Sequence, residues 1–252
     1  MYRGSFLLTV KLYPTYSFVA LFMLSIKIMN ETYLFDHISL DAAYILMSAF
    51  LAYQTSESIL SPQVDEYSRD AATISRFLFR FSGIFFPVYL ARVVFFAALP
   101  FYVPDIQGDL STKVFVVVVV LSEHFLECVL LLILVALFGL KLPAAFSGRH
   151  HKVKGKFRQK LSQSIEISIR LLVGPVLIST IGVAIYLSAY SISPSLKSLL
   201  LDGWIPNIIG ISLFLFSIAM QAWAVVMAFW ILSKSYIRLE YGDKGMQVVY
   251  RY

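Results

Sequence analysis

The stretch from Ser122 to Cys128 gathers reactive side chain types inside an otherwise apolar run. It reads Ser-Glu-His-Phe-Leu-Glu-Cys and follows the valines of residues 116–120 closely. Glu123 and Glu127 are four residues apart, a spacing that places both carboxylates on one helix face. His124 and Cys128 repeat that spacing on the neighbouring face. Ionisable groups are costly in hydrocarbon, so they usually face protein or water there and often carry function.

Glu123, His124 and Glu127 suggest two kinds of function, a metal-binding site and the active site of an intramembrane enzyme. Glu and His residues three or four apart can bind one ion, but a di-iron site needs a second helix with Glu-x-x-His. The other histidines of the chain lie in predicted loops, and no second helix of this kind is present. Walker, G-x-S-x-G and H-E-x-x-H motifs are also absent from the sequence. We therefore predict no metal, no cofactor and no catalytic residue, and keep the enzyme as an alternative.

The composition predicts that these residues lie within a membrane. Of the 252 residues, 59% are hydrophobic and 14% are charged, against roughly a quarter charged in soluble domains. The hydrocarbon layer of a membrane is about 30 Å thick, and each residue lengthens a helix by about 1.5 Å, so a helix of about 20 apolar residues crosses it. The sequence therefore predicts an all-α, multi-pass protein of the cell (inner) membrane, with one transmembrane domain over 1–252. Six runs are expected to span the lipid: 14–30, 38–54, 77–101, 114–140, 165–189 and 205–233.

The basic residues predict the orientation of these spans. Most of the 21 Lys and Arg residues lie in the two terminal tails and in segments 55–80 and 141–170. Because cytoplasmic loops of membrane proteins carry an excess of Lys and Arg, both termini and these two segments are expected in the cytoplasm. The same distribution explains the net charge of +6 without a nucleic acid partner.

Arg92 is a basic residue inside a predicted span. It lies about nine residues before the outer end of the third run, and Glu123 about ten residues after the outer start of the fourth, so the two share a depth. An ion pair between adjacent helices avoids an isolated charge in lipid. The Arg92–Glu123 pair would either fix helix packing or line a polar translocation path. Glu127, His124 and Gln221 are further candidates for lining such a path.

The fifth and sixth runs carry small and hydroxylated residues that allow helices to approach closely and to hydrogen-bond across their interface. Ser179, Thr180, Gly182 and Ser217 belong to this group. Gly174-Pro175 predicts a kink in the fifth run.

The layout and three short patterns resemble the membrane permeases of ABC-2-type exporters, which export capsular and lipopolysaccharide glycans. Residues 1–13 resemble the interfacial helix that precedes the first span of those permeases. Residues 79–92, Phe-Arg-Phe-Ser-Gly-Ile-Phe-Phe-Pro-Val-Tyr-Leu-Ala-Arg, resemble the start of their third span. Residues 194–207 resemble the external segment before the last span, although Pro206-Asn207 reverses the Asn-Pro order that is frequent there.

This resemblance implies a permease subunit of an ATP-driven exporter of a glycan or lipid-linked substrate. Two copies would form the path, and a separate cytoplasmic ATPase would supply the work. Segment 55–80 would dock that ATPase, because its mixed charges suit a polar protein contact; they include Asp65, Glu66, Arg69 and Asp70. A scaffold component of another membrane assembly is the second alternative beside the intramembrane enzyme.

Overall fold

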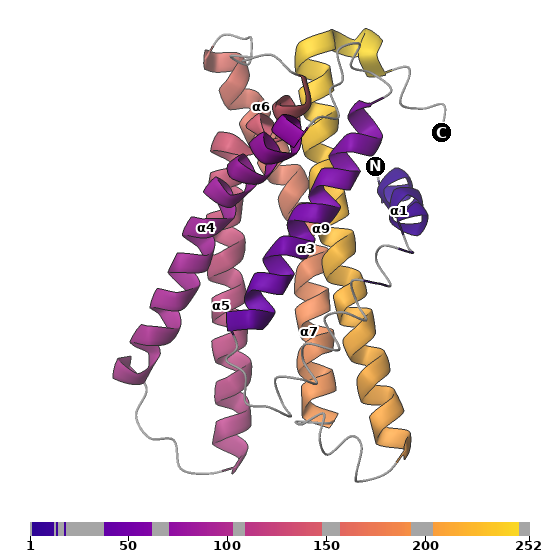
Figure 1. Ribbon diagram of the computed structural model, residues 1–252. Coiled ribbons are helices and arrows are strands. Elements are labelled where there is room, and N and C mark those ends of the chain that lie inside the picture. The colour runs from indigo at the N-terminus through magenta and orange to yellow at the C-terminus, as the bar shows by residue number, and fades with distance from the viewer. Residues whose placement is uncertain are drawn as a thin grey trace.

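The computed structural model describes residues 2–12, 14, 18, 38–61, 71–102, 109–147, 157–192 and 204–246. Nearly all of these residues are helical, as the apolar runs predict. The helices stand side by side in an elongated bundle, with α1 and the C-terminal part of α9 toward its upper end (Figure 1).

The long helices of the bundle are α3 (Ile38–Leu60), α4 (Ala71–Tyr102), α5 (Asp109–Phe138) and α9 (Trp204–Met246). Two short 3-10 helices, η1 (Gly139–Lys141) and η2 (Pro143–Ser147), follow α5. The fifth predicted run forms α6 (Phe157–Leu171), the π-helical turn η3 (Leu172–Val176) and α7 (Leu177–Ile192). A separate N-terminal helix, α1 (Tyr2–Lys11), packs against α9.

By length and composition, four segments within the described residues can cross a membrane: Ala71–Phe95, Val117–Phe146, Ser164–Ile185 and Ile208–Leu239. They match the third to sixth predicted runs. The predicted span 14–30 lies outside the described residues except for positions 14 and 18. The predicted span 38–54 forms most of α3, which is helical but is not among the four. The structure therefore supports an α-helical membrane protein, while the count of six spans stays a prediction.

The predicted kink at Gly174-Pro175 coincides with the π-helical turn η3, and both residues are buried. Proline has no backbone N–H and its ring clashes with the carbonyl four residues earlier, so a regular α-helical turn is disfavoured there. A π-helical turn widens the helix at this point and changes the direction in which later side chains project.

Helix α9 is longer than the sixth run predicts, because it continues from position 233 to Met246. With 43 residues at about 1.5 Å each it exceeds the thickness of a hydrocarbon layer. The hydropathy falls after Ser233, where Lys234 and Arg238 appear, but these residues are good helix formers. The run therefore marks the end of the apolar segment and not the end of the helix.

The packed core lies in the half of the bundle that holds the termini. Aromatic rings join α3, α4, η2 and α9 there: the Phe77 centroid is 5.5 Å from that of Phe146 and 6.1 Å from that of Phe229, and Tyr53 is 5.2 Å from Phe146. Arg80 of α4 donates to the carbonyl of Lys141 at 2.5 Å. These contacts hold the ends of α4 and α5 together and so fix the two helices that carry the intramembrane charges.

Candidate functional site

Arg92 of α4 lies against both carboxylates of α5. Its Nε contacts Oε1 of Glu123, and its Nη1 lies 3.9 Å from Oε1 of Glu127. The Glu123 side chain is 9% exposed, whereas the side chains of Arg92 and Glu127 are each 30% exposed. The two residues that the depth argument placed side by side are thus in contact, and Glu127 joins them from the next helical turn. We call these three residues the charged cluster.

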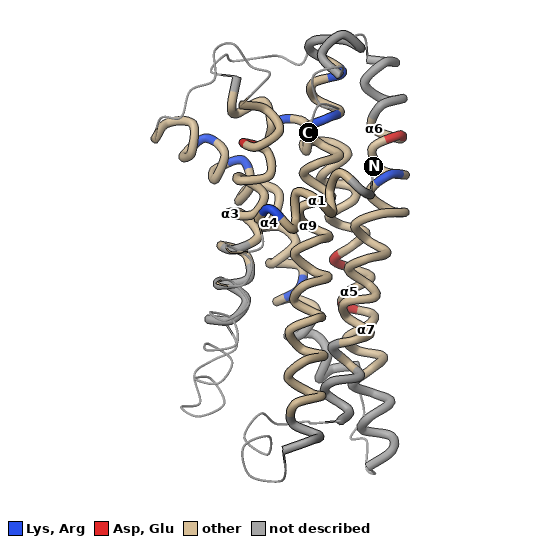
Figure 2. The backbone as a smooth tube through the Cα atoms, turned by 90° about the vertical axis from the view of Figure 1, so that its right-hand side faces the viewer, with Lys and Arg blue, Asp and Glu red and all other residues tan. Residues whose placement is uncertain are grey.

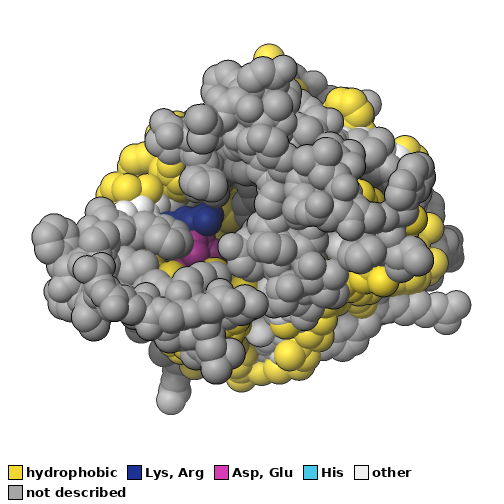
Figure 3. Space-filling model, turned by 90° about the horizontal axis from the view of Figure 1, so that it is seen from below, with side chains coloured by type: hydrophobic (Ala, Val, Ile, Leu, Met, Phe, Trp, Pro, Cys, Tyr) yellow, Lys and Arg dark blue, Asp and Glu magenta, His cyan; other side chains and the backbone are white. Residues whose placement is uncertain are grey.

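Among the described residues, Lys and Arg gather toward the upper end of the bundle, and a small group of basic and acidic positions lies near mid-height (Figure 2). Viewed from below, basic and acidic side chains are visible, with hydrophobic side chains near them (Figure 3).

His124 and Cys128 lie on a different face of α5 and turn toward α7. Nε2 of His124 is 3.2 Å from Oγ1 of Thr180 and 3.5 Å from Sγ of Cys128. Thr180 donates its hydroxyl hydrogen to the carbonyl of Val176 at 2.8 Å. Since a hydroxyl has one hydrogen, Thr180 must accept from His124, which places a hydrogen on Nε2 of the imidazole.

Gln221 links α9 to α7. It accepts from the Ser179 hydroxyl at 2.8 Å and donates from Nε2 to the Ser179 carbonyl at 3.1 Å. Ser217, one turn earlier, donates to the Gly182 carbonyl at 2.8 Å. A Cβ at Gly182 would lie 3.1 Å from Nε2 of Gln221 and 3.2 Å from Cβ of Met220, so the absent side chain permits this close approach. The small and hydroxylated residues of the last two predicted spans therefore do join their helices.

These contacts form a polar belt that runs from α4 through α5 and α7 to α9. Arg92 with Glu123 and Glu127 joins the first two helices, His124 with Thr180 the next two, and Ser179 with Gln221 the last two. The spacing of Glu123 and Glu127 predicts their common face. The sequence predicts an interhelical hydrogen bond for Thr180, but not that its partner is His124 of α5.

No protein-family model, curated protein or solved structure matches the chain. The chemistry of the polar belt is therefore argued from its own side chains. A guanidinium and two carboxylates can hold an ion or a proton, and the imidazole, hydroxyl and amide groups can bond a polar solute.

The imidazole and the carboxylates of the polar belt contact different helices. Glu123 and Glu127 contact Arg92 on α4, whereas His124 contacts Thr180 on α7, so the imidazole and the carboxylates serve different helices. Among the residues that the structure describes, no group of three or more His, Cys, Asp and Glu side chains could hold a metal ion. The four residues expected to dock an ATPase, Asp65, Glu66, Arg69 and Asp70, lie outside the described residues.

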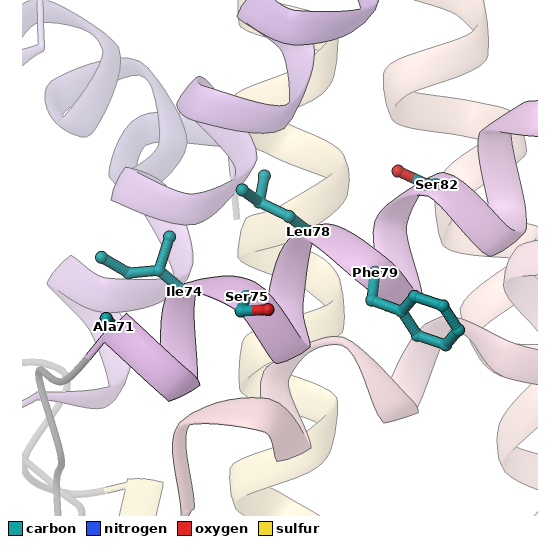
Figure 4. Close-up of a pocket in the computed structure, with 6 residues that line it drawn as sticks. All are labelled: Ala71, Ile74, Ser75, Leu78, Phe79 and Ser82. Carbon is teal, nitrogen blue, oxygen red and sulfur yellow. The ribbon is translucent and has the colours of Figure 1, made fainter.

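A hollow lies on the surface of α4, well away from the charged cluster. It has a volume of about 440 Å³ and opens along one side of the helix. Figure 4 shows its lining, which comes entirely from α4: Ala71, Ile74, Ser75, Leu78, Phe79 and Ser82. Because this lining is apolar apart from two serine hydroxyls, the hollow has none of the charge chemistry found at Arg92.

Proposed function

We propose that the chain is a transport subunit of the cell membrane in which the charged cluster lines a polar path. The observation that supports this proposal is exposure: Arg92 and Glu127 keep 30% of their side chains exposed within segments apolar enough to span a membrane. A charge that faces hydrocarbon is expensive, so a pair retained only for packing should be covered by its neighbours. Exposure to water would remove that expense, and charged side chains are visible when the molecule is viewed from below (Figure 3).

The permease type that the sequence resembles fits this proposal. Helix α1 and the C-terminal part of α9 lie at the end of the bundle where the described Lys and Arg residues gather, and we propose that this end faces the cytoplasm (Figures 1 and 2). We further propose that two copies form the path, that a separate cytoplasmic ATPase drives it, and that the substrate is a glycan or a lipid-linked molecule. Helix α1 packs on α9 at the level of Trp223 and Trp230, in keeping with a helix at the cytoplasmic membrane surface.

The two alternatives differ in what they require of the polar belt. An intramembrane enzyme would need Glu123, His124 and Glu127 to act on one substrate, but the imidazole and the carboxylates point to different neighbouring helices. A scaffold would need only covered contacts such as Ser179 with Gln221 and would not explain the exposure of Glu127. Transport is the function that uses the exposed charges.

Co-purification tests the proposed ATP-driven subunit. The tagged full chain is isolated from its native membranes in a mild detergent, bound proteins are identified by mass spectrometry, and ATP hydrolysis is measured after reconstitution in vesicles. We expect an ATPase to co-purify. Glu127→Gln should lower its transport-coupled hydrolysis without releasing it, whereas the control Glu166→Gln should leave hydrolysis unchanged, because Glu166 pairs with Arg170 away from the cluster. If no ATPase co-purifies with the unmutated chain, the proposal that the chain is a subunit of an ATP-driven exporter is wrong.

A further inference from the structure

A layer of aromatic rings crosses the packed core where α3, α4, η2 and α9 meet. It consists of Tyr53, Phe77, Phe146 and Phe229, and each ring centroid lies 5.2–6.1 Å from that of a neighbour in the layer. Helices α3 and α9 run from this aromatic layer toward the upper end of the bundle, whereas α4 runs away from that end (Figure 1). The residues that lie one turn above the aromatic layer therefore follow it in α3 and α9 and precede it in α4.

The turn above the aromatic layer carries three hydroxyl residues, Ser56 of α3, Thr73 of α4 and Ser233 of α9. Each is three or four residues from the aromatic residue of its own helix. Residues at this spacing share a helix face, so each hydroxyl lies on the face that carries the aromatic ring. All three residues are 0% exposed. The three helices therefore bring buried hydroxyls together at one level of the core, and we call these three residues the hydroxyl layer.

The hydroxyls of Ser56 and Ser233 lack the hydrogen bonds that buried hydroxyls usually make. Within the part of the chain that the structure describes, neither oxygen has a hydrogen-bond partner. The hydroxyls of Thr9 and Thr180, by contrast, each bond to the carbonyl four residues earlier in their own helix. Burial of a hydroxyl without a hydrogen bond is unfavourable, and ordered water generally satisfies such groups in folded proteins. Ser56 and Ser233 therefore require a small polar partner between the helices.

We propose that the hydroxyl layer is a buried binding site for water, which bridges α3, α4 and α9. A buried water makes about three hydrogen bonds, and a hydroxyl can donate one hydrogen and also accept, so three converging hydroxyls supply the partners that water needs. A metal cation fits the layer less well. Thr73 accepts from Nη2 of Arg76 at 3.1 Å, so a positive charge already lies at the edge of the layer and would repel a cation.

This inference goes beyond the proposed function and does not depend on it, because the water site is built from core residues and not from the charged cluster. At the hydroxyl layer, hydrogen bonding between α3 and α9 would pass through water. The contact between α7 and α9 is direct, since Ser179 bonds to Gln221 and Ser217 bonds to the Gly182 carbonyl. Helix α9 would therefore have a direct polar contact with α7 and a water-mediated one with α3.

Alanine substitutions distinguish a hydroxyl that binds water from one that binds nothing. We expect Ser56→Ala and Ser233→Ala, each made in the full chain, to lower the melting temperature in detergent by about 2–4 °C, because a hydrogen bond to the water is lost. A hydroxyl that binds nothing should give the opposite sign, because its removal relieves the burial of an unsatisfied group. Ser217→Ala calibrates the loss of a known hydrogen bond, since Ser217 donates to the Gly182 carbonyl.

Radiolytic labelling detects the water itself, because an X-ray pulse turns bound water into hydroxyl radicals that oxidise the side chains beside it. The full chain is irradiated in lipid vesicles with a tracer peptide that reports the dose, and oxidised residues are quantified by mass spectrometry. We expect more oxidation at Phe77, one turn from Thr73, than at Phe81, which is equally buried but one turn further from the hydroxyl layer. Oxidation of Phe77 should fall in a chain that carries both Ser56→Ala and Ser233→Ala.

Three results would overturn the proposal. The first is a higher melting temperature for both alanine variants, which would show that the hydroxyls bind nothing. The second is a loss of stability with Phe77 oxidised no more than Phe81, which would show that the hydroxyls bond directly to one another. The third is unchanged oxidation of Phe77 in the double variant. None of these readouts involves transport or an ATPase, so failure of this inference is distinguishable from failure of the proposed function.

Discussion

His124 of α5 and Thr180 of α7 are joined by a contact of 3.2 Å between Nε2 and Oγ1. Thr180 also contacts the π-helical turn η3. Its hydroxyl donates to the carbonyl of Val176, the last residue of that turn. The helix that carries the two carboxylates is therefore tied to the one irregular turn of the fifth predicted span. A change in that turn would act on His124 through Thr180.

Replacing Thr180 tests this tie. Thr180→Val preserves the shape of the side chain but removes the acceptor, so the partly buried His124 N–H loses its partner, and we expect a loss of about 1–3 kcal/mol in stability. Thr180→Ser should retain most of the stability, because it keeps the hydroxyl. Thr9→Val is a matched control, since Thr9 bonds only within its own helix, to the Ser5 carbonyl. Thermal unfolding in detergent provides the measurement, and equal melting points for Thr180→Val and Thr180→Ser would contradict the role given to the hydroxyl.

Gly182 offers a second test, of the close approach between α7 and α9. A Cβ there would lie 3.1–3.4 Å from atoms of Gln221, Met220 and Ser217, so Gly182→Ala should destabilise the chain by about 1–3 kcal/mol. Gly83→Ala is the control, because no atom lies within 4 Å of a Cβ at that position of α4. There the higher helix propensity of alanine should leave stability unchanged or raise it by up to about 1 kcal/mol. Opposite signs for the two glycines, measured by thermal unfolding, are the expected result.

A double-mutant cycle measures the Arg92–Glu123 pair. Arg92→Leu and Glu123→Leu should each lower the folded yield in the membrane, because each leaves a charge without this partner in an apolar segment. The double variant should recover much of the loss, since neither member of the pair then remains without the other in an apolar segment. Folded yield is read by size-exclusion chromatography of a fluorescent fusion. A double variant no better than the worse single variant would show that the pair does not hold α4 and α5 together.

Normal folding in all three variants, with transport alone lost, would give a different answer. The charges would then serve the path and contribute little to packing. Both outcomes can be read from the same set of proteins, because yield and activity are measured separately.

Cysteine labelling in a Cys128→Ala background tests the predicted orientation of the chain in the membrane. Ser147 ends η2 at the basic end of the bundle, and Ser195 belongs to a connection that is poor in Lys and Arg. A cysteine at position 195 should react with a membrane-impermeant thiol reagent added outside intact cells, and one at position 147 should react only after the membrane is opened. The reverse pattern would invert the assignment of the cytoplasmic side.

The sequence predicts the parts of the site that depend on position along a helix. Arg92 and Glu123 meet because their runs are antiparallel neighbours with a short connection, so equal distance from that connection means equal depth. Glu127 follows from the four-residue spacing. These inferences need only the helical rise and the side of the membrane on which each run begins.

Contacts that depend on how the helices pack around one another are not predictable in this way. The pairing of His124 with Thr180 requires α7 to lie beside α5, and runs that are apolar on all sides give no period that selects a neighbour. The length of α9 beyond the predicted span is not predictable for a related reason, because hydropathy reports the apolar segment and the helix continues beyond it to Met246. The π-helical form of the turn at Pro175 likewise depends on the packing around it.

The central claim, that the charged cluster faces a water-filled path, is tested most directly by the reactivity of a cysteine at position 127. Glu127→Cys and Phe125→Cys are compared in a Cys128→Ala background, with a charged, membrane-impermeant thiosulfonate added from the outer side. Phe125 is 71% exposed and Glu127 30%, so exposure alone would make position 125 the more reactive. We expect the opposite, because a thiol reacts as its thiolate, which forms in water and not in lipid. Reaction at 127 with none at 125 supports the path, and no reaction at 127 would contradict it.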